Sequence, residues 1–183
     1  MAFNINMIGK RTSHEIIKDI ARAAYGLFSR RPPSAVTLRE IAAAANVNLG
    51  LIHRYVGSKD DVISLVLAGV SAQGVALAAI QDDDTLVAAI AEEMIDRPAT
   101  GRLIAGMVLD GVDIARLKDG VPLVERLARN NSKLDAAMIA AFNLGWEVFG
   151  DQLLINLNEQ PDRETLLQAV QDAMRALQNR NQK

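Results

Sequence analysis

The chain has 183 residues, half of them hydrophobic, with 20 Lys/Arg against 22 Asp/Glu and no cysteine. This length can bury a core, and the lack of cysteine excludes disulfides, thiolate metal sites and cysteine nucleophiles. We expect a cytoplasmic protein with no signal peptide and no membrane span, because residues 1–11 lack an apolar block and no apolar run approaches about 20 residues.

The first predicted element is an amphipathic helix over residues 13–29. Thr12 and Glu15 have the spacing of a capping box, which satisfies two amide donors at a helix start. Two prolines within residues 30–33 end the helix, because proline cannot continue the hydrogen-bond ladder. Its apolar residues recur at three- and four-residue spacing, as on one buried face: Ile16, Ile20, Ala24, Leu27 and Phe28.

Two short helices joined by a tight break follow. Thr37 and Glu40 form a second capping box, and the helix they open ends at Asn46, a residue that tolerates a left-handed turn. Asn48 then caps a helix over residues 49–56. Helices this short are marginal in water, so packing must hold them. The pattern predicts a helix-turn-helix, whose second helix can enter the major groove of DNA.

A long fourth helix and several further helices make up the rest of the chain. Ser58 and Asp61 cap the fourth, over residues 59–80. The last two helices are predicted over residues 133–157 and 162–178. The apolar stripe of the first consists of Met138, Phe142, Trp146, Phe149 and Leu153, and that of the second of Leu166, Val170, Ala173, Met174 and Leu177. The first helix also has small residues at four-residue spacing that permit close helix packing: Ala137, Ala141 and Gly145.

Charge is distributed unevenly along the chain. Residues 1–65 hold nine Lys/Arg and five Asp/Glu, whereas residues 66–183 hold eleven and seventeen. A basic first third suggests that only this part faces a polyanion. Within it, Arg54 can reach a guanine edge or a phosphate, and Lys59 can reach a phosphate from the start of the fourth helix.

The residues of this region, in their order along the chain, resemble the DNA-binding signature of the tetracycline-repressor (TetR) family. Asn46 stands where that family favours glycine, and an asparagine can do the same backbone work. His53 stands where the family usually has tyrosine, whose side chain is longer. Asn48 stands where Ser or Thr is common in the family, and Val56 where Phe is frequent. The run that carries the resemblance, these departures included, is Thr37, Ile41, Ala42, Val47, Asn48, Gly50, Ile52, His53, Tyr55, Val56, Lys59 and Asp60.

The resemblance implies an all-α, dimeric transcription factor, most often a repressor, that a small-molecule effector releases from a palindromic DNA operator. We expect a three-helix DNA-binding domain over residues 1–60 and an α-helical effector-binding and dimerisation domain over residues 61–183. The last two helices should form the homodimer contact and bury the Leu166 to Leu177 stripe there. Leu49 and Leu51 can touch thymine methyls or belong to the core. By family position the DNA-facing candidates are Thr37, Arg39, Asn48, Leu49, Gly50, Leu51, His53, Arg54, Tyr55 and Lys59.

Effector-binding residues are harder to assign from sequence. Asp110 and Asp113 are either polar anchors in a pocket or part of a solvated helix face. Phe142 and Trp146 either line a pocket or pack in a core or dimer seam. The candidates are Met94, Met107, Asp110, Asp113, Phe142 and Trp146.

No enzymatic signature accompanies these features. His14 and His53 have no carboxylate at metal-ligand spacing, and no nucleophile elbow or phosphate-binding loop is present. We therefore expect no metal, no cofactor and no catalytic residue. The main alternative is a helical dimeric interaction protein that does not read DNA; an enzyme built on the same helices is a third.

Overall fold

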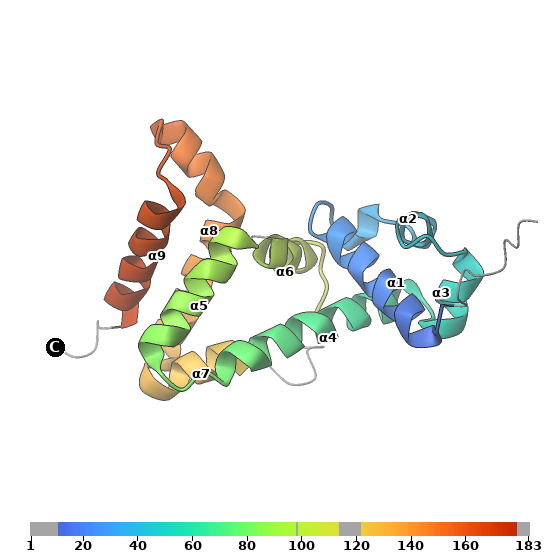
Figure 1. The fold of residues 1–183 in the computed structure, drawn as a ribbon, viewed down its shortest axis with the longest axis horizontal. Coiled ribbons are helices and arrows are strands. Elements are labelled where there is room, and N and C mark those ends of the chain that lie inside the picture. The colour runs from blue at the N-terminus through green and yellow to red at the C-terminus, as the bar shows by residue number, and fades with distance from the viewer. Residues whose placement is uncertain (1–10, 98, 114–121, 179–183) are drawn as a thin grey trace, which may run out of the picture.

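The computed structural model describes residues 11–97, 99–113 and 122–178, which form helices and connecting loops without a strand (Figure 1). The predicted all-α fold is confirmed for this part of the chain. The elements are α1 Ser13–Phe28, the 3-10 helix η1 Pro33–Ala35, α2 Leu38–Ala44, α3 Leu49–Tyr55, α4 Lys59–Ala78, α5 Asp83–Asp96, α6 Ala99–Leu109, α7 Pro122–Asn130, α8 Lys133–Leu157 and α9 Arg163–Gln178.

The predicted capping residues begin the first four helices. The Thr12 hydroxyl accepts the amide of Glu15, whose carboxylate accepts the amide of Thr12 at 2.7 Å. The same reciprocal arrangement opens α2 and α4, and the Asn48 side chain caps α3. Each cap contributes about 1 kcal/mol, so the helix starts are locally determined.

One apolar core holds α1, α2 and α3 together and extends beyond them. Ile20 of α1 is fully buried with Ile41 of α2 and Ile52 of α3. The same cluster includes Val62, Ile63, Val66 and Leu67 near the start of α4, and it includes Leu103 and Met107 of α6. The three-helix head, defined here as residues 11–56, is therefore packed against α4 and α6.

A second core lies at the other end of the molecule, among α5, α7, α8 and α9. Val170 and Met174 of α9 are buried there, with Leu166 and Leu177 packed against the same cluster. The prediction that the Leu166 to Leu177 stripe forms the dimer seam is wrong for this reason: α9 uses that stripe to cover α5 in its own subunit.

Helix α4 joins the two ends and is the one described helix long and apolar enough to cross a membrane by length and composition. The expectation that no apolar segment approaches this length is therefore wrong. Ser, Gly and Gln interrupt the apolar residues of α4, but they add no charge, so the helix as a whole stays apolar. Its buried apolar residues, Val62, Ile63, Val66 and Leu67, belong to the head core. A core helix of a globular protein passes the same test of length and composition.

Candidate nucleic-acid interface and ligand cavity

The turn between α2 and α3 adopts the geometry that its asparagine allows. Asn46 has a φ of 51°, in the left-handed region, and the amide of Val47 donates to Ala42 at 2.9 Å. Arg11 donates to the carbonyl of Asn46 at 2.5 Å and pairs with Asp19 at 3.1 Å. Arg11 thus clamps the turn to α1, a role that sequence reasoning missed because its partner is 35 residues away.

Helix α3 buries one side and exposes the other. Ile52 is fully buried in the head core, and Leu51 and Tyr55 pack against that core while half-buried. Leu51 therefore contributes to packing, whereas Leu49 is half-buried outside the cluster. The exposed side presents Gly50, His53 and Arg54 together with the capping residue Asn48.

The two basic residues of α3 differ in how they are held. The Arg54 guanidinium lies over the Tyr55 ring, 5.5 Å from its centroid, and is otherwise directed to solvent. Nδ1 of His53 lies 3.2 Å from the carbonyl oxygen of Gly57. When Nδ1 donates to that carbonyl, Nε2 becomes the acceptor that faces outward. Arg54 therefore keeps its donors for a ligand, while His53 uses one nitrogen to hold the end of α3.

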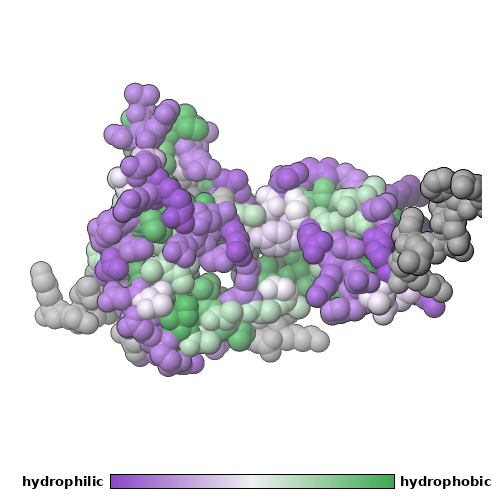
Figure 2. Space-filling model, viewed as in Figure 1, coloured by the Kyte–Doolittle hydropathy of each residue, from purple (hydrophilic) through white to green (hydrophobic). Residues whose placement is uncertain are grey.

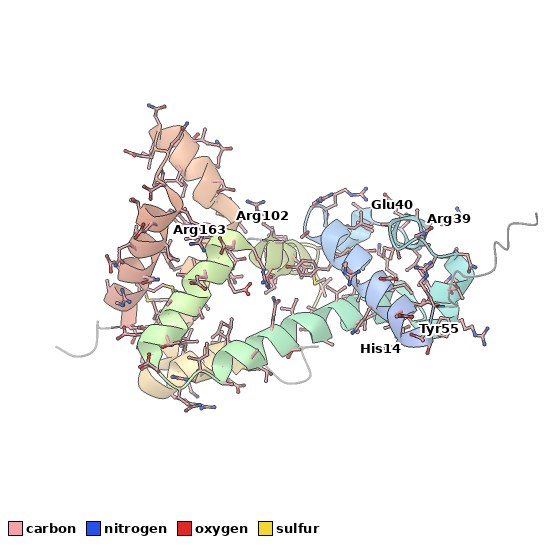
Figure 3. The ribbon with its side chains drawn as sticks, in the orientation of Figure 1. His14, Arg39, Glu40, Tyr55, Arg102 and Arg163 are labelled. Atoms are coloured by element: carbon pink, nitrogen blue, oxygen red, sulfur yellow. The ribbon has the colours of Figure 1, made fainter. Side chains whose placement is uncertain are left out.

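The remaining DNA-facing candidates come from α2 and α4. Figure 3 shows Arg39 on α2 and Tyr55 on α3 at the end of the molecule farthest from α9. Arg39 is exposed, and the Thr37 hydroxyl is engaged in capping α2. Lys59 is half-buried at the first turn of α4, and its charge helps to lower the pKa of Asp110, after the larger effects of two hydrogen bonds from Ser34.

Gly57 fixes the turn between α3 and α4. Its φ of +121° is one that L side chains rarely adopt, and an added Cβ would lie 2.5 Å from the Asp61 carboxylate that caps α4. We expect Gly57→Ala to lower the free energy of unfolding by about 1–3 kcal/mol, measured by urea denaturation. Gly26→Ala is the control, because a Cβ there meets nothing within 4 Å. Equal stability of both variants would contradict this account of the turn.

A cavity of about 320 Å³ lies between the two cores, lined by residues of α4, α5, α6, α7 and α8. Figure 2 shows the molecular surface hollowed between α4, α5 and α6, with apolar atoms on the α4 side. Volumes of this size suit small ligands. The apolar wall includes Val70, Leu77, Ile90, Met94, Ile104, Leu123 and Leu144.

Of the six effector-binding candidates, only Met94 lines this cavity. Met107 is fully buried in the head core, and Phe142 and Trp146 pack against the second core. The carboxylate of Asp110 accepts hydrogen bonds from the amide and hydroxyl of Ser34 at 2.7 and 2.5 Å. Asp113 is exposed outside the cavity wall. Helical spacing does not reveal which face of a helix meets a cavity, and the two aspartates lie beyond the end of α6.

Among the described residues that line the cavity, Glu147 of α8 has the pKa that departs most from its ordinary value. Its carboxylate accepts the amide of Gly101, near the start of α6, at 2.6 Å. Burial raises the pKa of Glu147 to about 7; the Gly101 amide opposes this rise, the charge of Glu93 adds to it, and Arg102 opposes it. Sequence reasoning missed Glu147, because it stands among apolar residues of α8 with nothing local to mark it.

The titration of Glu147 makes stability depend on pH. From an ordinary value of 4.5 to about 7, the folded protein keeps a proton that the unfolded chain has released. Stability should therefore fall as pH rises through this window, by about 1–2 kcal/mol after allowance for solvent screening. Glu147→Gln should remove this part of the pH slope in urea denaturation, and Glu92→Gln, at an exposed site on α5, should retain it. An identical slope in the wild-type protein and the Glu147→Gln variant would refute the assignment.

Helix α6 contacts both the cavity and the head. Thr100, Gly101 and Ile104 line the cavity. The hydroxyl oxygens of Thr100 and Tyr25 of α1 lie 2.8 Å apart, and Asp110, directly after α6, holds Ser34 of η1. A change in the cavity that moves α6 would therefore act directly on α1 and η1.

Metal binding has no support among the described residues, which form no group of three or more His, Asp or Glu able to hold an ion.

Comparison with known proteins places these features in a wider context. Residues 20–66 match the model of one protein family, the bacterial regulatory proteins of the tetR family. The chain is 34% identical to the HTH-type transcriptional repressor Rv3405c of Mycobacterium tuberculosis over 76% of each chain, and equally to the HTH-type transcriptional regulator Mb3439c of Mycobacterium bovis. A crystal structure assigned to the TetR-family transcriptional regulators, from Mesorhizobium loti, shares the fold with a TM-score of 0.54 and 15% identity, covering 92% of this chain and 97% of its own.

Proposed function

This chain belongs to the TetR family of bacterial regulatory proteins and is a DNA-binding transcriptional regulator, and we propose that it is a repressor released from a palindromic operator by a small molecule. Residues 1–60 would bind DNA, and residues 61–183 would bind the effector and dimerise. Working on chromosomal DNA, it would act in the cytoplasm and without catalysis.

We assign DNA reading to the exposed side of α3, supported by α2 and the start of α4. Arg54 would contact a base edge, since its donors are turned to solvent. Arg39, His53 and Lys59 would bind phosphates and set the position of α3 in the groove. Leu51 is removed from this set as a packing residue, because it contacts the head core.

We assign dimerisation mainly to one face of α8. Ala137 and Ala141 are exposed, and a Cβ at Gly145 would meet nothing within 4 Å, so a second backbone has room to approach. Large apolar residues lie exposed along the same helix, and burying them would supply the driving force. These exposed residues are Leu134, Met138, Phe149, Leu153, Ile155 and Leu157. Two heads related by a two-fold axis would then require a palindromic site.

Helix α6 carries the argument for ligand control. It lines the cavity through Thr100, Gly101 and Ile104 and contributes Leu103 and Met107 to the core of the head. A ligand that prefers one position of α6 would bias the orientation of the head. The free energy by which it shifts this equilibrium can be no larger than the difference between its binding free energies for the two conformations. Because both heads must fit half-sites about 34–36 Å apart, small reorientations would reduce operator affinity.

Selection from a pool of random DNA duplexes tests the proposal. Successive rounds should enrich one palindromic sequence, and fluorescence anisotropy should give a dissociation constant that rises steeply with salt concentration. Equal, weak binding to every duplex would instead support an interaction protein that does not read DNA. The operator obtained in this way is the probe for the ligand and mutant experiments below.

A further inference from the structure

The polar groups of the cavity are biased towards negative charge. Glu93 and Glu147 both line it, and no Lys, Arg or His is found among its described lining residues. Arg97 pairs with Glu93 at 3.3 Å. Glu147 has no such ion pair with a described cation: Arg102 donates to the backbone carbonyl of Glu147 and to the carboxylate of Asp151.

Two buried oxygens of the same cavity wall also lack partners among the described residues. The side chains of Ser71 on α4 and Asn143 on α8 are buried and line the cavity, and Oγ of Ser71 and Oδ1 of Asn143 have no hydrogen-bond partner in the described part of the chain. An unsatisfied buried polar atom costs about 1–3 kcal/mol. Asn143 lies one helical turn before Glu147, so the two side chains can address one ligand group. The cavity therefore offers a carboxylate, with two buried oxygens in the same wall, in surroundings that are mostly apolar.

We propose that this cavity binds a lipophilic cation, a molecule with an apolar body and one protonated amine that pairs with the Glu147 carboxylate. The apolar body would fill the space between α4, α5 and α7, and the ammonium donors would lie against Glu147 with Asn143 or Ser71 in reach. The regulatory meaning of this binding rests on the proposed repressor function; the chemical class of the ligand does not.

Other ligand classes fit the same wall less well. An anionic amphiphile would place its charge near Glu93 and Glu147, and like charges in a site of low dielectric constant repel strongly. A neutral apolar ligand would remove the remaining water from Glu147 and give no charge in return, which penalises the carboxylate. A cation offsets the cost of desolvating the Glu147 carboxylate by pairing with its charge, and its N–H groups can donate to an unpaired oxygen of the cavity wall. The cavity volume of about 320 Å³ restricts the ligand to a small molecule.

Three probes of equal length and different charge test the proposal: octylammonium, octanol and octanoate. Calorimetric titration of the full chain at about pH 8, where both Glu147 and the amine are charged, gives the three dissociation constants. A charged hydrogen bond worth about 1.5–3 kcal/mol predicts that octylammonium binds at least about ten-fold more tightly than octanol. Octanoate should bind more weakly than octanol.

Glu147→Gln should bring the affinities for octylammonium and octanol together, because it weakens binding of the amine and removes the charged carboxylate that octanol would desolvate. Glu92→Gln is the matched control on α5, because Glu92 is exposed and does not line the cavity; it should retain the preference for the amine. If Glu147→Gln does not fold, the wild-type protein still provides the test, since lowering pH from about 8 to about 6 should protonate Glu147 and reduce the preference for the amine roughly ten-fold.

Equal affinities for amine and alcohol, tighter binding of octanoate, or no binding of any probe would overturn the cationic class. A preference for the amine that persists in Glu147→Gln would also overturn it. Anisotropy with the selected operator tests the repressor function separately. If octylammonium binds as predicted but leaves DNA affinity unchanged, the ligand class holds and ligand-controlled release fails.

Discussion

Arg54→Ala is expected to weaken binding of the dimer to its selected operator by about 2–6 kcal/mol. Loss of one good side-chain contact to a base edge costs about 1–3 kcal/mol, and two heads engage the operator. Arg54 has no role in the folded core, because its guanidinium is exposed and lies only over the Tyr55 ring. The free energy of unfolding should therefore change little, which separates recognition from stability.

Anisotropy titrations of the operator and of a scrambled duplex provide the measurement. A contact with a base predicts a large loss on the operator and a small loss on the scrambled DNA. A contact with a phosphate predicts similar losses on both and a salt slope that falls by about one for each head. Arg129→Ala is the control, since Arg129 is an exposed arginine on α7, away from the head. Unchanged operator affinity in Arg54→Ala would remove this residue from the contact surface.

Gly145→Leu is expected to weaken the dimer by about 2–6 kcal/mol without unfolding the subunit. Within one subunit a Cβ added at this position meets nothing within 4 Å, and leucine is a better helix former than glycine. In a two-fold interface each new side chain would push into the facing helix, and overpacking costs about 1–3 kcal/mol at each site.

Sedimentation velocity across a range of protein concentrations would measure this effect, with circular dichroism to confirm the fold. Gly69→Leu is the matched control, because Gly69 is an exposed helical glycine on α4 with nothing within 4 Å of an added Cβ. A wild-type protein that stays monomeric, or equal dissociation of both variants, would exclude the α8 interface. The Gly145→Leu monomer should also lose most of its operator affinity, because one head cannot span two half-sites.

The DNA-binding head was largely predictable because its signals are local. Thr12, Thr37, Asn48 and Ser58 each cap a helix through amides within three residues of themselves. Asn46 adopts the left-handed conformation expected of it. Such contacts depend on sequence spacing alone, so the helix starts and the turn could be placed before the fold was known.

Five of the six effector-binding candidates lie outside the cavity, because a cavity is a property of several helices at once. Asp110 looked like a pocket anchor but holds η1 through Ser34, which is 76 residues away in sequence. Glu147 attracted no notice in an apolar stretch, yet the fold seats its carboxylate on the amide of Gly101. Each outcome depends on how α6 packs against the head and against α8.

The same limit applies to apolar stripes. The apolar stripes of α8 and α9 looked alike as dimer surfaces. Val170 and Met174 of α9, however, are buried against α5, whereas Phe149 and Leu153 of α8 remain exposed. By itself, the sequence determined where helices begin, which residues can form a helix-turn-helix and which family pattern they follow, because caps and turns act over three or four residues. Only the tertiary structure decided which apolar faces meet inside one subunit and which acids line the cavity, because burial results from contacts between segments far apart in the chain.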